Sequence, residues 1–589
     1  MGAYQEVVDK LPPHLKIFAV DQNYDQYSPI NQACWRYIMR GHLHHFKKHG
    51  PKVYTDGIHK SGITVDEIPT IDGINEHLAK MGWSAVVVNG FIPPNAFMEF
   101  QQHKIFPVSA EMRTMEHILY TPAPDIVHEA AGHVPIILES EYSEFLSKVG
   151  EYGSKSIFTK KDQEVYKAIR NLSIVKEWPN ATEEDVVNAE KNLTLTLEKN
   201  ETPSEATLIS RFHWWTVEYG LVGEVENPEI FGAGLLSSMG ESRTCLDSDV
   251  KKIPLSIDCF NYSYDITSKQ PQLFVAKDWE HLLNVLEEFA STMAFRVGGV
   301  VSLEKAIASE NQATIQYSSG LQVSGLLTKA HCAGELETYI QMTGPTSLCF
   351  HDKELKNHGP EQHGEGFGSP VGKLVDVKRP LENHTNDELK EIGITIGESC
   401  ELNFLSGVKV SGVLKELKRK ENKKIILMTF ENCTVTGSKG EELFNPSWGV
   451  YDMAVGERIV SVFSGPADKV KYPDGTYKSD DNAIEIKYTE EEKTLFKKYS
   501  KVRTIRENVK KGAKLDMNEL HLIYMNLKKK YPSDWLLRIE IYELLVSDEE
   551  NAEHSMVGSI TEELEKLKEV SVEQKFLIEE GIKLIQLAL

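Results

Sequence analysis

Hydrophobic residues in the first half of the chain recur at intervals of three and four. Trp35 to Phe46 shows this spacing, and so does Trp279 to Met293. In a helix, the second stretch would present one broad apolar face, formed by Leu282, Leu283, Leu286, Phe289 and Met293. Such spacing is typical of amphipathic helices that bury one stripe in a core. Residues 1–300 are therefore predicted to form one large, mainly α-helical domain.

From about Ala306 to Val470 the pattern changes to short β-branched runs separated by Gly and Asn, which indicates strands and turns. The region contains an internal repeat, because Gln316–Leu326 (QYSSGLQVSGL) matches Asn403–Val413 (NFLSGVKVSGV). The QMT triplet at 341–343 likewise matches LMT at 427–429. Self-similarity of this kind predicts a duplicated unit. Residues 301–487 are expected to form a β-rich domain with an internal duplication.

Helical spacing returns in the last part of the chain. It is kept by Leu520, Ile523, Tyr524, Leu527, Leu536, Leu537, Ile541 and Leu544. Residues 488–589 are therefore predicted to be a packed α-helical region and not a disordered tail. The predicted fold class is a multidomain protein with an α-rich catalytic domain, a β-rich duplicated region and a helical C-terminal region.

Composition narrows the classes of partner. The chain has 589 residues, a formal net charge of −23 and a pI near 5.4. Nucleic acids and anionic membranes need clustered Lys and Arg, so neither partner is expected. The seven cysteines are odd in number and far apart, which favours a reducing compartment. We find no secretory signal at the N-terminus and no apolar run of roughly 20 residues. A soluble, cytoplasmic protein is expected.

The densest group of polar residues lies in YTPAPDIVHEAAGHVP, residues 120–135. It is similar to the zinc-protease motif H-E-x-x-H, but His128 and His133 stand five residues apart instead of four. On a regular helix the two side chains would point roughly 140° apart, so both reach one ion only if the helix widens or ends near Gly132. The alternative is that both are buried, hydrogen-bonded histidines. The neighbouring Asp125 and Glu129 favour a metal, with Asp125 holding an imidazole N–H.

A third ligand is sought elsewhere, because Glu129 points to another side of the helix. Trp214, Trp215, Glu218 and Leu221 are three or four residues apart and are expected to share a helix face. A carboxylate on such an apolar stripe is costly without a cation or strong donors. The alternative is a Glu that reaches the surface or pairs with an Arg. Two His and one Glu would form the facial triad of non-haem Fe(II) oxygenases.

Four stretches together resemble the pterin-dependent aromatic amino acid hydroxylases, the family of phenylalanine, tyrosine and tryptophan hydroxylases. They are YTPAPDIVHEAAGHVP, WWTVEYGL, FGAGLLSSMGE (231–241) and QLFVAKDWEHL (272–282). The resemblance extends from about Tyr27 to Gly299. It implies the aromatic amino acid hydroxylase fold, and a monooxygenase that hydroxylates the ring of an aromatic amino acid. Its cofactors would be Fe(II) and a tetrahydropterin, either tetrahydrobiopterin or a related bacterial pterin, with O2 as co-substrate.

The resemblance also assigns site residues. The iron ligands would be His128, His133 and Glu218. The substrate would contact Arg113, Thr121, Trp214, Gly234 and Ser237, with Arg113 binding its carboxylate. The pterin would contact Gly90, Phe91, Ile92, Phe97 and Glu129, with Phe97 stacking on its ring. The chain departs from the animal enzymes at His213, where they have Tyr, and at Pro107, where they have His.

Phenylalanine is the expected substrate, because the FPV segment (106–108) and the short N-terminus resemble bacterial phenylalanine hydroxylases. Tryptophan or tyrosine hydroxylation is the alternative within the family. Outside it, the alternatives are a zinc hydrolase and a non-catalytic scaffold that keeps the hydroxylase fold. The C-terminal half is expected to form an assembly, regulatory or partner-binding unit, and a homo-oligomer is one such assembly. Its FHDKELKNHGPEQHGEGFG segment, with His351, His358, His363 and Glu365, suggests either a second metal site or, as we favour, a polar Gly-rich loop.

Overall fold

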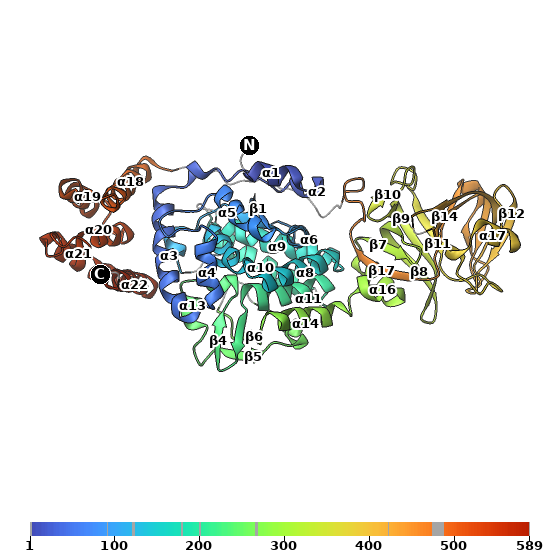
Figure 1. Ribbon diagram of the computed structural model, residues 1–589, viewed down its shortest axis with the longest axis horizontal. Coiled ribbons are helices and arrows are strands. Elements are labelled where there is room, and N and C mark those ends of the chain that lie inside the picture. The colour runs from blue at the N-terminus through green and yellow to red at the C-terminus, as the bar shows by residue number, and fades with distance from the viewer. Residues whose placement is uncertain are drawn as a thin grey trace.

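The structure is a computed structural model. It describes residues 3–90, 92–119, 124–177, 181–199, 202–264, 269–421, 423–473 and 488–587. Along these ranges a mainly helical part is followed by strands and then by helices, as the hydrophobic pattern predicts (Figure 1). Within the same ranges, no helix is both long enough and apolar enough to cross a membrane.

The N-terminal part consists of helices packed around two small sheets. Its longer helices are α3 (Pro29–His49), α8 (Ser140–Lys155), α9 (Lys160–Glu177), α10 (Glu183–Glu198) and α14 (Trp279–Ala290). Shorter helices include α1 (Ala3–Lys10), α4 (Lys52–Lys60), α5 (Ile71–Leu78), α6 (Pro94–Gln102), α7 (Val134–Ile137), α11 (Glu205–His213) and α12 (Ala233–Ser237). The α3 helix begins with a capping box between Ser28 and Asn31 and Pro29 at its first position, both common start signals.

One small sheet contacts the helical segment Val127–His133, and the other contacts the segment Trp214–Glu218. Strands β1 (Ser84–Val88) and β2 (Ile105–Ser109) pair in parallel. The second sheet has the order β4-β3-β6-β5, formed by β3 (Leu221–Glu224), β4 (Asn227–Ile230), β5 (Lys251–Pro254) and β6 (Gln272–Ala276). Leu221 therefore begins a strand, which corrects the expectation that it continues the helical face of Glu218. The chain turns at Gly220, where a Cβ would lie 2.2 Å from the Phe231 ring.

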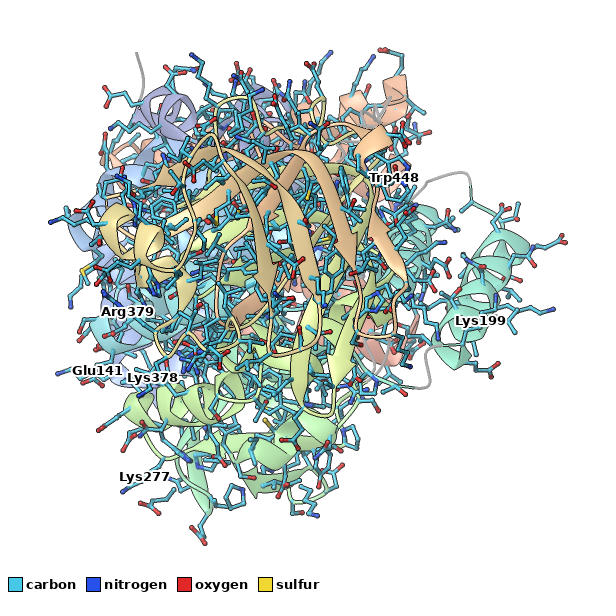
Figure 2. All side chains as sticks on the ribbon, turned by 90° about the vertical axis from the view of Figure 1, so that its right-hand side faces the viewer. Glu141, Lys199, Lys277, Lys378, Arg379 and Trp448 are labelled. Atoms are coloured by element: carbon cyan, nitrogen blue, oxygen red, sulfur yellow. The ribbon has the colours of Figure 1, made fainter. Side chains whose placement is uncertain are left out.

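Two larger sheets follow at one end of the molecule (Figure 1). The first has the order β10-β9-β8-β7-β17 with β11 beside β9, and the second β12-β13-β14-β15 with β16 beside β14. Their bounds are β7 (Gln312–Tyr317), β8 (Leu321–Ala333), β9 (Leu336–Phe350), β10 (Lys353–Glu354), β11 (Gly366–Pro370), β12 (Ser399–Asn403), β13 (Lys409–Arg419), β14 (Ile425–Thr436), β15 (Glu442–Phe444), β16 (Tyr451–Ala454) and β17 (Ile459–Ser464). Figure 2 looks onto this end, where Trp448 is 61% exposed. Helix α16 (Gly299–Ser309) connects the first sheet to the N-terminal part.

The C-terminal helices return to the opposite end of the molecule and lie beside α3 (Figure 1). They are α18 (Glu490–Lys510), α19 (Met517–Lys530), α20 (Leu536–Val546), α21 (Ser555–Leu567) and α22 (Val572–Gln586). Their buried residues, from Tyr499 to Ile585, belong to the same continuous apolar cluster as those of the N-terminal part, whereas each large sheet has its own cluster. The helices thus complete the N-terminal core.

Candidate metal centre

Two short π-helices carry the three candidate ligands. One spans Val127–His133 and the other spans Trp214–Glu218. In a π-helix the N–H of each residue bonds to the carbonyl five residues before it, as the Tyr219 N–H does to Trp214 O at 2.8 Å. Side chains five residues apart therefore lie above one another. The widened helix at residues 127–133 is the local irregularity that the spacing of the two histidines predicts.

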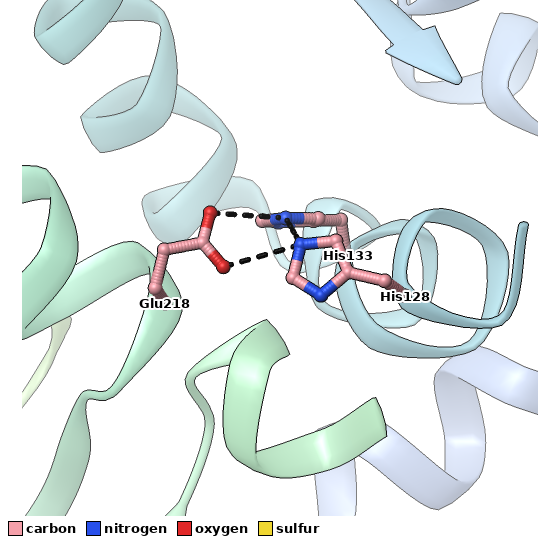
Figure 3. Close-up of side chains that lie close together, drawn as sticks. All are labelled: His128, His133 and Glu218. Carbon is pink, nitrogen blue, oxygen red and sulfur yellow. Dashed lines mark hydrogen bonds and ion pairs between the residues drawn. The ribbon is translucent and has the colours of Figure 1, made fainter. Parts of the chain in front are cut away.

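The structure brings His128, His133 and Glu218 together (Figure 3). The Nε2 atoms of the two histidines are 3.1 Å apart. The Glu218 carboxylate lies 3.2 Å from Nε2 of His128 and 3.3 Å from Nε2 of His133. Two ligands about 2.1 Å from one ion and at right angles to each other would be about 3.0 Å apart, so these separations fit three adjacent positions of an octahedron.

The arrangement of the polar partners differs from one sequence-based expectation. Asp125 accepts hydrogen bonds from Nε and Nη2 of Arg113, at 2.8 and 2.7 Å, and from the backbone N–H of His128. It does not hold the imidazole. The Nδ1 atom of His128 instead lies 3.1 Å from Ser237 Oγ. Ser237 thus orients the ring of a candidate ligand, which is a supporting role that metal-binding histidines require.

Close backbone packing places α12 against both π-helices. A Cβ on Gly132 would lie 2.8 Å from Ala233 O, and one on Gly234 would lie 2.9 Å from the Tyr219 ring. The Trp214 ring stacks on Tyr219 and on Tyr264, with centroids 4.6 and 4.3 Å apart. Glycine at these positions lets Ser237 approach His128.

Among the described residues predicted to contact the pterin, Glu129 follows His128 in the chain and Phe97 approaches Glu218 through His213. Glu129 is 5% exposed and its Oε2 has no hydrogen-bond partner among the described residues. Phe97 on α6 lies edge-on to the His213 ring, with centroids 5.8 Å apart. Gly90 has a left-handed backbone (φ 53°), and Ile92 is half-buried just before α6. The predicted residues Phe91 and Thr121 lie outside the described residues.

Burial and neighbouring charges shift the acid–base behaviour of the site. Burial alone would raise the pKa of the Glu218 carboxyl, but His133 and His128 lower it well below its usual range. Burial raises the pKa of Glu129 to about 8. Glu218 therefore remains an anion. Burial alone would lower the pKa of His128, but Glu218 raises it to about 9, so a divalent cation that binds here displaces a proton from this imidazole.

Two residues near the ligands were not among the predicted site residues. His213 Nδ1 lies 3.8 Å from Glu218 Oε1, and burial lowers the pKa of His213 to about 4. The Phe106 ring lies 4.8 Å from the His133 ring. In the sequence, His213 is notable only because the animal enzymes of the family that the chain resembles have Tyr at this position. Phe106 lies in the FPV segment that resembles bacterial phenylalanine hydroxylases, but that resemblance gave it no role beside the metal ligands.

The donor atoms fit iron. Two imidazole nitrogens and a carboxylate lie on one side of a common point, and this ligand set is typical of non-haem Fe(II) oxygenases. The Nδ1 atom of His133 is buried without a hydrogen-bond partner among the described residues, so its Nε2 is the nitrogen that faces the other ligands. The five-residue spacing and the π-helix distinguish this centre from the H-E-x-x-H centre of zinc proteases.

Comparison with known proteins gives consistent matches over this part of the chain. Residues 21–176 and 195–299 match the family described as biopterin-dependent aromatic amino acid hydroxylase. A phenylalanine-4-hydroxylase of Mesorhizobium japonicum is 27% identical over 285 residues, which cover 47% of this chain and 87% of the relative. That of Chromobacterium violaceum is 26% identical, with 44% of this chain and 76% of the relative covered.

Among solved structures, a phenylalanine hydroxylase of Chromobacterium violaceum with bound iron(III) and 7,8-dihydrobiopterin is similar to this chain. Its sequence is 24% identical and the TM-score is 0.37, with 47% of this chain and 85% of that chain covered.

Proposed function

We propose that the first half of this chain, which matches the biopterin-dependent aromatic amino acid hydroxylase family, converts phenylalanine to tyrosine with iron, dioxygen and a tetrahydropterin. The observation that carries the proposal is the facial group of His128, His133 and Glu218, whose ligand atoms are 3.1 to 3.3 Å apart. Phenylalanine is supported by the names of the bacterial relatives, which are phenylalanine-4-hydroxylases.

In this proposal His128, His133 and Glu218 hold the iron, which together with the pterin supplies the activation of dioxygen. Ser237 keeps the His128 ring in position through the contact at Nδ1. Trp214, which stacks on Tyr219 and on Tyr264, forms a rigid wall for an aromatic substrate, and Gly234 lets the backbone of α12 pack closely against the Tyr219 ring. Buried apolar walls exclude water that would consume the oxidant.

Arg113 is proposed to bind the substrate carboxylate. Three of its five N–H groups are used, two by Asp125 and one by the carbonyl of Ser237, so two remain for a ligand. The pair with Asp125 is nearly fully buried, with side chains 1% and 4% exposed. Asp125 thus holds the guanidinium in one orientation, which suits the planar recognition of a carboxylate.

The pterin is proposed to lie against Gly90, Ile92 and Phe97, with Glu129 bonding to its ring. The family resemblance adds Phe91 to these pterin contacts and Thr121 to the substrate contacts. The free Oε2 of Glu129 supplies the hydrogen-bonding atom. Phe97 offers an aromatic face or edge close to His213.

The test of this function is anaerobic reconstitution of the full chain with Fe(II), followed by O2, tetrahydrobiopterin and Phe, Tyr or Trp in separate reactions. Mass spectrometry should detect tyrosine formed from phenylalanine. His128→Ala, His133→Ala and Glu218→Ala should lose bound iron and at least about 100-fold in turnover, because each removes a ligand. His44→Ala, an exposed histidine on α3, should retain both.

Other outcomes decide between the alternatives. Hydroxylation of Trp or Tyr in preference to Phe would change the substrate within the family. Absence of any hydroxylated amino acid in the presence of bound iron would favour the non-catalytic scaffold.

We also infer that the two large sheets are copies of one unit. The strand pairs β8–β9 and β13–β14 have register shifts at matching places, between Ser324 and Leu326 in one and between Ser411 and Val413 in the other. A second shift follows in each, at 327/329 and at 414/416. Matching β-bulges support a common origin, because bulges are specific, retained features.

The C-terminal helices are proposed to mediate self-association. On α19 Leu522 and Met525 are 65% and 50% exposed and lie three residues apart, which places apolar surface on one helix face.

The cytoplasm is proposed as the location of the protein. All seven cysteines, each within the described residues, are free thiols, which supports a reducing compartment.

A further inference from the structure

A second group of metal-binding side chains lies where the two large sheets meet. His358 and His363 belong to the connection between β10 and β11 of the first sheet, and Asp452 lies on β16 of the second. One ligand atom from each of the three lies within 4.8 Å of the others. We propose that His358, His363 and Asp452 bind a zinc ion that joins the two sheets.

The separations fit a tetrahedral ion. Asp452 Oδ2 lies 3.4 Å from His358 Nδ1 and 3.8 Å from His363 Nε2. Ligands about 2.0–2.1 Å from a tetrahedral zinc ion are roughly 3.3 Å apart, so a small inward movement of His363 completes the geometry. The two rings are nearly parallel, with centroids 5.7 Å apart and an interplanar angle of 14°.

Both histidine nitrogens that face Asp452 lack a hydrogen-bond partner among the described residues. The side chains of His358 and His363 are only 10% and 11% exposed, so solvent does not readily supply the missing hydrogen bonds to these nitrogens. A buried ring nitrogen without a partner is costly. The two imidazole nitrogens lie near the Asp452 carboxylate but form no hydrogen bond to it. All three groups can therefore bind one metal ion placed between them.

The backbone holds each ligand in place. The carbonyl of His358 accepts from Leu348 N–H at 2.9 Å, and that of His363 accepts from Thr346 N–H at 3.0 Å, so both residues are fastened to β9. On the other sheet, the Thr429 hydroxyl donates to Asp452 Oδ1 at 2.6 Å. This bond orients the carboxylate and leaves Oδ2 for the ion, the arrangement that supports metal ligands in general.

Lys418 competes with the ion. Its ammonium lies 2.9 Å from His358 Nε2, so in the absence of metal it donates to that nitrogen. When zinc binds Nδ1 of His358, the neutral imidazole carries its proton on Nε2, so this nitrogen can no longer accept from Lys418. The positive charge of the ion also repels the Lys418 ammonium. Lys418 is 25% exposed and lies 3.8 Å from Glu416, so it can turn toward solvent and that carboxylate when metal binds. Metal affinity is therefore expected to rise when Lys418 loses its charge.

Two imidazoles and one carboxylate favour zinc over the oxygen-preferring Mg²⁺ and Ca²⁺, and water would occupy the fourth position. The ion would fasten a loop of one sheet to a strand of the other, about 90 residues later in the chain. His351 and Glu365, in the same His-rich segment, are exposed and lie outside the cluster.

The experiment uses the full chain with His128→Ala and His133→Ala, which removes the first centre, stripped by chelator and titrated calorimetrically with Zn²⁺. One equivalent should bind. Loss of a residue that only supports a metal ligand weakens metal binding by about 10–100-fold. His363→Ala and Asp452→Asn each remove a ligand and should weaken Zn²⁺ binding by more than this. His351→Ala is the matched control and should bind as the parent does. Lys418→Met should bind about 10-fold more tightly.

The chain without substitutions provides a second measurement. After the first centre is filled with Fe(II), Co²⁺ should add one equivalent with the intense visible bands of four-coordinate cobalt, and Asp452→Asn should abolish them. The proposal is overturned if the parent binds no Zn²⁺, if His351→Ala weakens binding as much as His363→Ala, or if the cobalt bands survive Asp452→Asn. In that case the three residues form a polar network with Lys418 as its cation.

Discussion

At the scale of single residues, the hydrogen-bond partner of a polar side chain determines its orientation and therefore its role in the site. Asp125 illustrates this, because a carboxylate three residues before a candidate metal ligand has several possible partners. In the structure it pairs with Arg113 and with the His128 backbone, while Ser237 takes the position beside the imidazole. Sequence proximity predicted that Asp125 holds the imidazole, but the partner of that ring comes from α12, which lies about 100 residues later.

Glu99 is a residue whose charge links two regions of the chain. It is 6% exposed on α6 and lies 2.7 Å from Lys469, which follows β17, and 2.7 Å from His14. Burial would raise the pKa of Glu99, but Lys469 and the histidines hold it far below its usual 4.5. Because the folded pKa is lowered, this stabilisation is fully present above about pH 4.5 and is lost as the pH falls below it.

We therefore expect Glu99→Gln to lower the free energy of unfolding by about 3 kcal/mol at pH 7, since it removes the buried carboxylate that pairs with Lys469 and His14. The difference between wild type and variant should shrink by about 1 kcal/mol between pH 7 and pH 4. Urea unfolding curves at several pH values measure this. Glu76→Gln, at an exposed position on α5, is the control and should follow the wild type at every pH. A difference for Glu99→Gln that does not change with pH would contradict the assignment.

At the scale of elements, the candidate centre depends on helices that deviate from regular geometry and on close helix contacts. The π-helix at Val127–His133 continues directly into α7, and α4 packs on α7 at Gly57. A Cβ on Gly57 would lie 2.1 Å from Pro135 O, a backbone atom that has little freedom to move. Position 57 is therefore restricted to glycine by packing, although it lies inside a helix.

Gly57→Ala is expected to destabilise the protein by about 1–3 kcal/mol and to lower iron affinity, because it pushes α7 and the attached π-helix away from Glu218. Gly558 on α21 provides the matched control, since a Cβ there meets nothing within 4 Å. Gly558→Ala should stabilise by up to about 1 kcal/mol, as Ala does in an open helix. Thermal unfolding and iron titration of both variants test this. Equal effects of the two substitutions would show that packing at Gly57 is not decisive.

At the scale of the whole molecule, the C-terminal helices are held on the N-terminal part by a buried charge network. Arg36 on α3 bonds to Glu540 at 2.9 Å and to Glu543 at 2.7 Å, both on α20. Arg506 on α18 also pairs with Glu540. The Tyr37 hydroxyl, also on α3, donates to the carbonyl of Leu577 on α22. These contacts join residues about 500 positions apart around one apolar core.

Arg36→Met should destabilise the docking of helices α18–α22 by about 3–5 kcal/mol, because Glu540 and Glu543 lose a buried partner. Limited proteolysis should then cleave these helices faster than in the wild type. Arg503→Ala removes a largely exposed pair with Glu67, with side chains 33% and 55% exposed, and should cost less than about 1 kcal/mol. Similar cleavage of the two variants would mean that apolar contacts alone hold the helices.

The amino-acid sequence alone determined the elements and the chemistry that local patterns encode. Helical spacing predicted α3 and α14, and the alternation of β-branched runs with Gly predicted the strands of the sheet region. The five-residue spacing of His128 and His133 predicted a distorted helix, because a regular one cannot aim both rings at one ion. The motif resemblance identified the family.

Only the tertiary structure decided which distant residues meet. It placed Ser237 beside His128, and Asp452 beside His358 and His363. It also joined the C-terminal helices to α3 in one core, where the sequence suggested a separate region. The physical reason is that periodicity and spacing report on a residue's own helix or strand. A contact between residues separated by a hundred or more positions depends on how whole elements pack, and leaves no local pattern by which to recognise it.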